Sequence, residues 1–176
     1  MPFPLPFIPT LSYKTGGRKF GAPRDGGIRK HAGCDLIAPR GTDIIAIDDG
    51  FVIEPAAKFY RGTCQLTIRH PAGVIRYCEI EDESFLKQYR AGTAVKAGQV
   101  IAHVGKMYRD SMLHFEWYNG TAAGPLTVRS NAGFQRRTDL VDPAPLLDKL
   151  TRDVRPRSGS QVGAEMAAAV MGRLPG

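Results

Sequence analysis

The chain has 176 residues, of which 24 are Lys or Arg and 17 are Asp or Glu, so its formal net charge is +7. A hydrophobic content of 43% and a charged content of 23% are typical of a folded globular domain and exclude wholesale disorder. No apolar run approaches the roughly 18 residues of a membrane-spanning helix. The basic charge favours an anionic partner, such as nucleic acid, acidic lipid or cell-wall polymer, and the alternative is a basic surface without a partner.

Residues 1–19 are predicted to form an extended segment that packs on the domain. The opening MPFPLPFIP superficially resembles an export signal, but it lacks a basic start, and four prolines in nine residues interrupt any helical apolar core. We therefore expect synthesis in the cytoplasm without a signal peptide. The three cysteines have no C-x-x-C spacing, which indicates neither a disulfide framework nor a zinc ribbon.

Two β-hairpins are predicted in the first half of the chain. The run 42–47 is followed by the turn dipeptide Asp49-Gly50 and by a second run from Phe51, which is the pattern of a hairpin. The runs 64–69 and 74–79 form the second hairpin, with a four-residue turn and with the first residue of one strand opposite the last residue of the other.

Two more strands are predicted at 99–104 and 113–118, and helical patterns follow at 144–150 and 165–171. Short strands at this spacing predict a mainly β fold, an antiparallel β-sandwich or open barrel with short C-terminal helices. We place the domain at 20–154 and a basic, small-residue tail at 155–176.

Histidines are the first candidates for chemistry. His31 precedes Asp35 by four residues, about 13 Å along an extended strand, so both reach one ion only if the chain bends, which Gly33 permits. A histidine, an aspartate and one more imidazole would suit a zinc ion that keeps one open position. His70 lies at a turn and is expected to be solvated, and His103 is expected to be a core or surface residue of a strand.

Three separated motifs occur in the order and spacing of a known family. They are His31-Ala-Gly-Cys-Asp35 with the following Ala38-Pro-Arg-Gly-Thr42 and Gly50-Phe-Val52, then Val95-Lys-Ala-Gly-Gln-Val-Ile101, and finally Leu113-His-Phe-Glu116. With these motifs the chain resembles the lysostaphin/LytM-type zinc metallopeptidases, which are peptidoglycan endopeptidases, from about Phe20 to Tyr118. Biotinyl and lipoyl carrier domains share part of the pattern, but Lys106 lacks the symmetric context of a modifiable lysine.

The resemblance implies a zinc ion held in a groove by His31, Asp35 and His114. The family has two further histidines that orient the attacking water and stabilise the oxyanion, and this chain has Met112 and Glu79 at those positions. Because Met112 can neither donate a hydrogen bond nor transfer a proton, an active enzyme needs another donor for the oxyanion. Tyr77, Tyr108 and Arg109 are the candidates.

Glu79 has three possible roles at this stage. As a general base it would take a proton from the attacking water, as a carboxylate does in other zinc hydrolases. As a fourth ligand it would close the metal site and make it structural. As an exposed strand-end carboxylate it would have no role. We take the general base as the prediction.

The cysteines are not predicted to act as nucleophiles. Strand alternation should turn Cys34 away from the metal, because it lies between two of the implied ligands. Cys78 alternates with Glu79 and should likewise face away from the groove. Thiolate chemistry would also require a nearby base, and the sequence offers none.

The function implied is zinc-dependent hydrolysis of peptide bonds in peptidoglycan stem or cross-bridge peptides, by a phage-type lysin or an antibacterial effector. Delivery machinery and an immunity or inhibitor protein are the partners expected, and the site of action is the periplasm or cell wall after non-classical delivery. The alternative is a catalytically degenerate zinc-holding module that binds wall peptides or scaffolds a partner. A nucleic-acid-binding β domain is disfavoured because no aromatic–basic stacking motif is present.

Overall fold

The structure is a computed structural model that describes residues 1–108 and 110–152. Arg109, the helical pattern at 165–171 and the tail at 155–176 lie outside the described residues. The strands and the helix are β1 (Pro23–Arg24), β2 (Arg29–Lys30), β3 (Cys34–Ile37), β4 (Asp43–Ile45), β5 (Gly50–Lys58), β6 (Cys64–His70), β7 (Gly73–Ile80), β8 (Ala94–Val95), β9 (Val100–His103), β10 (Met112–Tyr118), β11 (Leu140–Val141) and α1 (Ala144–Thr151). Short 3-10 helices span Gly16–Arg18, Asp25–Gly27 and Ser84–Gln88.

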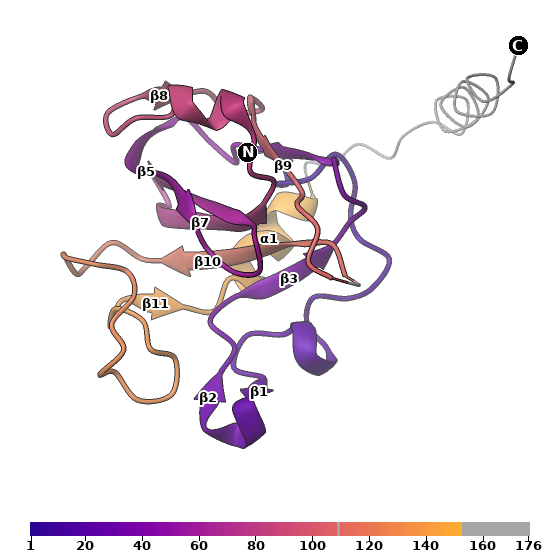
Figure 1. Cartoon of the computed structure of the whole chain (residues 1–176), viewed down its shortest axis with the longest axis vertical. Coiled ribbons are helices and arrows are strands. Elements are labelled where there is room, and N and C mark those ends of the chain that lie inside the picture. The colour runs from indigo at the N-terminus through magenta and orange to yellow at the C-terminus, as the bar shows by residue number, and fades with distance from the viewer. Residues whose placement is uncertain (109, 153–176) are drawn as a thin grey trace, which may run out of the picture.

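A seven-stranded antiparallel sheet forms the centre of the molecule (Figure 1). Its strand order is β11-β10-β7-β6-β5-β8, and β3 pairs with β10 as well, whereas β1–β2 and β4–β9 form two smaller sheets. The predicted mainly β, antiparallel fold is confirmed, and within the described residues the sheet does not close into a barrel. No helix of the described residues is long and apolar enough to span a bilayer.

The two faces of the main sheet have different chemistry. In β10, Leu113 and Phe115 are fully buried in the core, while His114 and Glu116 point to the opposite face. Helix α1, at the place predicted for 144–150, buries three leucines in the same core as Leu113 and Phe115. One face of the sheet therefore stabilises the fold, and the other is left for polar side chains.

The hairpin of β6 and β7 is confirmed, with a tighter turn and a different register. His70 pairs with Gly73, so only two residues form the turn. Cys64 lies opposite Ile80 and not opposite Glu79, because the register shifts after Cys64 and leaves Glu79 as an extra residue of β7. Gly73 has a φ of 124°, and a Cβ there would lie 2.2 Å from a backbone oxygen of β10.

The hairpin predicted around Asp49-Gly50 is wrong. Strand β4 pairs with β9, and β5 pairs with β6 and β8. The turn is tied to other parts of the chain, because the Asp49 carboxylate accepts hydrogen bonds from Ala97 N and Lys96 Nζ, each at 2.9 Å. The peptide N–H of Ile47 donates to the Tyr77 hydroxyl at 3.3 Å. These contacts direct β4 and β5 into different sheets.

Apolar residues of the N-terminal segment contact the rest of the structure. Phe3 and Leu5 are buried in the main core, and the carbonyl of Pro4 accepts a hydrogen bond from Ile45 N at 2.9 Å. The hydroxyl of Tyr13 donates to Asp148 of α1 at 2.6 Å. The apolar residues between the prolines thus cover part of the core.

Candidate metal centre

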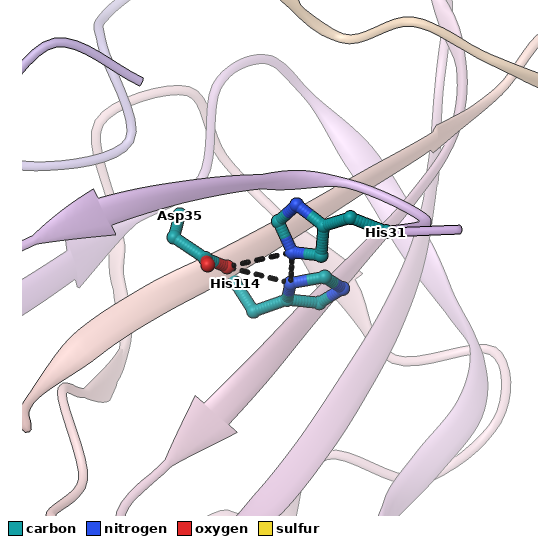
Figure 2. Close-up of side chains that lie close together, drawn as sticks. All are labelled: His31, Asp35 and His114. Carbon is teal, nitrogen blue, oxygen red and sulfur yellow. Dashed lines mark hydrogen bonds and ion pairs between the residues drawn. The ribbon is translucent and has the colours of Figure 1, made fainter. Parts of the chain in front are cut away.

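Three side chains from two distant segments of the sequence converge on one point (Figure 2). His31 Nε2 lies 3.0 Å from Asp35 Oδ1 and 3.0 Å from His114 Nδ1, and His114 Nδ1 lies 2.8 Å from Asp35 Oδ1. All three residues are buried. A tetrahedral zinc ion with bonds of about 2.0–2.1 Å separates its ligand atoms by about 3.3 Å, so this donor set fits such an ion closely.

A bend in front of β3 brings His31 to Asp35. The strand begins only at Cys34, so the four-residue step from His31 is not extended. Gly33 makes the close approach possible, because a Cβ there would lie 2.4 Å from the carbonyl oxygen of Phe115. The imidazole of His31 is held from behind by a 2.9 Å hydrogen bond between Nδ1 and the carbonyl of Lys19, which directs Nε2 toward the cluster.

The register of β3 and β10 brings Asp35 to His114. The two residues are direct partners across the antiparallel ladder, so their side chains project from the same face of the sheet. Asp35 belongs to the first motif and His114 to the last, which means that one strand pairing unites two motifs 79 residues apart.

Glu116 supports His114 from the side away from the cluster. Its Oε1 lies 3.2 Å from His114 Nε2 and also accepts hydrogen bonds from Arg136, while Oε2 accepts from the Tyr118 hydroxyl at 2.7 Å. Glu116 is fully buried, and these partners compensate its charge. When a metal ion replaces the proton on Nδ1, Nε2 of His114 can still donate to Glu116 while Nδ1 presents its lone pair to the ion.

The charges of the cluster favour a cation. Burial alone would raise the pKa of Asp35, but hydrogen bonds from His114 and His31 bring it below its ordinary value. Burial would lower the pKa of His114, yet its hydrogen bonds to Asp35 and Glu116 raise it to about 10. Without a metal, the cluster therefore holds an extra proton on His114. A divalent cation would replace that proton.

Glu79 lines the same cavity because of a β-bulge. It is the unpaired residue of β7, with a φ of 64°, a left-handed conformation that is unusual outside glycine. Glu79 is buried, and its Oε2 has no hydrogen-bond partner among the described residues. Burial raises the pKa of Glu79 to about 7, and the neighbouring charges of His114 and Asp35 act in opposite directions.

The bulge also corrects the prediction for Cys78. Cys78 is the direct partner of His114 across β7 and β10, so it shares the polar face of the sheet and does not face away from it. Strict alternation failed because Glu79 breaks it. Cys34 does face the core, as predicted, opposite Phe115. Burial raises the pKa of both thiols, that of Cys34 to about 12, so neither is a ready nucleophile.

The candidate oxyanion donors do not gather at the cluster. Tyr77 is fully buried on the core face, where its hydroxyl accepts from Ile47 N and contacts His70 Nε2 at 3.0 Å, so it is wrongly placed for this role. Tyr108 is 81% exposed and lines a neighbouring pocket. Arg109 is outside the described residues. Met112, as its sequence position implied, lines the cavity beside the cluster.

The other two histidines have different surroundings. His70 is buried and not solvated as predicted, because Tyr77 and the carbonyl of Asp49 take up its two ring nitrogens. His103 is partly exposed on β9, and its Nδ1 lies 2.9 Å from Glu83. Neither residue belongs to the three-residue cluster.

The cavity around the cluster has a volume of about 420 Å³ and is called the metal groove below. Its described lining consists of Arg24, Asp25, Arg29, His31, Ala32, Asp35, Phe59, Tyr60, Glu79, Met107, Met112, His114 and Arg136. A cavity of this size, with a few polar groups that converge in it, is typical of a small-molecule or peptide site.

Comparison with known proteins identifies the family of the chain. A family model described as peptidase family M23 matches residues 29–125, more than half of the chain. The chain is 31% identical over 139 residues to the peptidoglycan DD-endopeptidase ShyC of Vibrio cholerae, over 74% of this chain and 31% of that protein. It is 30% identical over 128 residues to lysostaphin of Staphylococcus staphylolyticus, over 69% of this chain and 26% of that protein. These matches span less than a third of either relative.

The fold has solved counterparts as well. The catalytic domain of lysostaphin from Staphylococcus simulans matches 74% of this chain and 89% of that domain, with a TM-score of 0.54 at 23% identity. The chain belongs to peptidase family M23, of the LytM/lysostaphin type, which is a family of metallopeptidases. The predicted family is therefore confirmed.

Proposed function

We propose that the protein hydrolyses peptide bonds in bacterial peptidoglycan with a zinc ion held by His31, Asp35 and His114. The observation that carries the proposal is the convergence of these three donors at a groove large enough for a peptide. One relative supports the substrate, because it is named a peptidoglycan DD-endopeptidase. Two imidazoles and one carboxylate are a common ligand set of catalytic zinc, which keeps a further position open.

A bound zinc ion would supply Lewis-acid polarisation of the scissile carbonyl and activation of water. The protein supplies the geometry. Gly33 and the ladder of β3 and β10 bring the donors together, and Glu116 keeps the imidazole of His114 in the tautomer that faces the groove. Since these supports come from backbone register and buried hydrogen bonds, the donors need little reorganisation when an ion or substrate binds.

Glu79 is proposed to move the proton. Its carboxyl lies in the groove with one oxygen unpartnered, and burial raises its pKa to about 7, so at neutral pH it can both accept and release a proton. Glu79 would take a proton from the attacking water and give it to the leaving amine. Met112 cannot share this task, because a thioether carries no transferable proton.

The proposed place of action is the periplasm or the cell wall, reached by non-classical delivery, with delivery machinery and an inhibitor protein as partners. Secretion assays on the intact producing cell, with a tag at the C-terminal end, test it by comparing cytoplasmic and wall fractions.

Digestion of purified sacculi tests the activity. The zinc-loaded protein should release fragments with new amino groups, identified by mass spectrometry, and a chelator should stop the release. The His31→Ala/His114→Ala variant is the matched inactive control. If the parent binds sacculi without releasing fragments, the protein is the degenerate wall-binding module, which the loss of both family histidines at Met112 and Glu79 would then explain.

A further inference from the structure

Two arginines lie side by side at the edge of the metal groove. Strands β1 and β2 form a small antiparallel hairpin, and Arg24 and Arg29 are direct partners across it. Figure 1 shows this hairpin beyond β3, at the end of the molecule away from β8. Direct partners project from one face, and both arginines line the groove. Like charges in this position are destabilising, and an anion bound between the two guanidinium groups would offset their repulsion.

The charge of Arg29 is compensated only weakly. Its Nε donates to Asp25 at 2.9 Å, but the Asp25 side chain is 63% exposed, and exposed ion pairs of this kind contribute little to stability. The terminal nitrogens of Arg29 have no hydrogen-bond partner among the described residues. An incoming carboxylate can therefore bind to these nitrogens without the loss of a strong interaction.

Arg24 lies between Arg29 and the metal cluster and contacts a residue of that cluster. Its NH2 group donates to the carbonyl of Gly17 at 2.6 Å and lies 3.5 Å from Asp35 Oδ2, the oxygen that does not face His114. A group bound between Arg24 and Arg29 would consequently lie next to Asp35, one of the three residues of the cluster. The third arginine of the groove, Arg136, is 2.7 Å from the buried Glu116 and is already paired.

The remainder of the groove does not compete for an anion. Phe59, Tyr60, Met107 and Met112 contribute aromatic and apolar surface, and the ring of Phe59 stacks on His114 with centroids 6.2 Å apart. The groove therefore combines a cationic rim with apolar surface. Such a groove suits a peptide that has both apolar side chains and a carboxylate.

We propose that Arg29, together with Arg24, binds a free carboxylate of the substrate adjacent to the scissile bond. This inference rests on the proposed peptidase function and specifies its substrate class. Stem peptides of peptidoglycan carry free carboxylates on their acidic residues, whereas oligoglycine cross-bridges carry none within the chain. The protein is accordingly specific for carboxylate-bearing stem peptides, and guanidinium groups are well suited to bind them in a bidentate manner.

A matched pair of synthetic cross-linked stem peptides tests the proposal. The two peptides differ only in one group, a free carboxylate next to the scissile bond or the corresponding carboxamide. We expect the zinc-loaded protein to cleave the carboxylate peptide with a kcat/KM about tenfold higher, mainly through KM, because a charge-assisted hydrogen bond is lost in the amide. Arg29→Gln should remove this preference, so that the ratio of the two kcat/KM values falls to about one.

Arg90→Gln is the matched control, because it removes the same charge from an exposed arginine outside the groove lining. It should keep the full preference. Equal cleavage of both peptides by the parent, or an equal loss on both in Arg29→Gln, would overturn the proposal. If neither peptide is cleaved, the peptidase function fails, and calorimetric titration of the zinc-loaded protein decides this inference separately. Tighter binding of the carboxylate peptide supports it, and equal affinities overturn it.

Discussion

The carboxylate of Glu116 lies 3.2 Å from Nε2 of His114, while Nδ1 of the same imidazole lies 2.8 Å from Asp35. The two ring nitrogens thus face different partners, one deep in the protein and one in the groove. Since Arg136 and Tyr118 also donate to Glu116, the carboxylate cannot turn away from His114 without losing other hydrogen bonds. The sheet therefore sets both the position and the orientation of this imidazole.

Replacement of Glu116 should weaken metal binding. In Glu116→Gln the hydrogen-bond acceptor for His114 loses its charge, and we expect zinc affinity to fall about 10–100-fold. Competition with a chromophoric chelator measures this change. Glu54→Gln is a matched control, because Glu54 lies on β5 and contacts Thr67 instead of His114. An unchanged zinc affinity in a folded Glu116→Gln protein would show that the orientation of His114 does not depend on Glu116.

Metal binding should depend on all three residues of the cluster. We expect one zinc ion per chain in the parent, a weaker affinity in Asp35→Ala and loss of stoichiometric zinc in His31→Ala/His114→Ala. Elemental analysis after dialysis measures the occupancy. His103→Ala is the control, because it removes an imidazole that lies outside the cluster. Full zinc occupancy in the double variant would refute the assignment.

Catalysis should depend on Glu79, whereas zinc binding should not. General-base assistance contributes about 10²–10⁴-fold, so Glu79→Gln should lower kcat by about that factor while zinc stays bound. Glu79→His, which places the family's residue here, should keep part of the activity or exceed the parent. Release of zinc from Glu79→Gln would instead identify Glu79 as a ligand. An undiminished kcat would remove it from the mechanism.

The pH dependence of stability should report the burial of Glu79. Its pKa in the folded protein is raised to about 7 from an ordinary 4.5, so the folded state holds the proton more tightly than the unfolded chain. The free energy of unfolding therefore falls as pH rises from 4.5 to 7, by up to about 3 kcal/mol. Above pH 7 this loss of stability is complete and no longer changes with pH.

Metal-free Glu79→Gln should lack this pH-dependent loss of stability. Its stability relative to the metal-free parent should be about equal below pH 4.5 and should increase up to pH 7, as measured by urea unfolding at several pH values. The comparison cancels the contributions of other titrating groups, provided that they are unchanged. A difference that does not vary with pH would show that Glu79 titrates alike in the folded and unfolded states.

The sequence by itself determined the family, the β-rich class and most strands. Alternation of polar and apolar residues predicted β6, and short β-rich runs between turn signals predicted β7, β9 and β10. The motif spacing singled out His31, Asp35 and His114 before any contact was known. These features depend on residue types at short spacings along the chain. The sequence alone therefore contains them.

Other features were decided only by tertiary structure. The pairing of β4 with β9 depends on contacts of Asp49 with residues almost 50 positions away, which no local turn signal contains. Cys78 was assigned to the wrong face because a bulge at Glu79 interrupts alternation. The sequence also does not predict the roles of Glu116 and Arg24, because both depend on contacts between distant segments. This holds even for Glu116, which ends the last motif. A hydrogen bond or an ion pair between distant segments is set by register and burial, and these exist only once the sheet has formed.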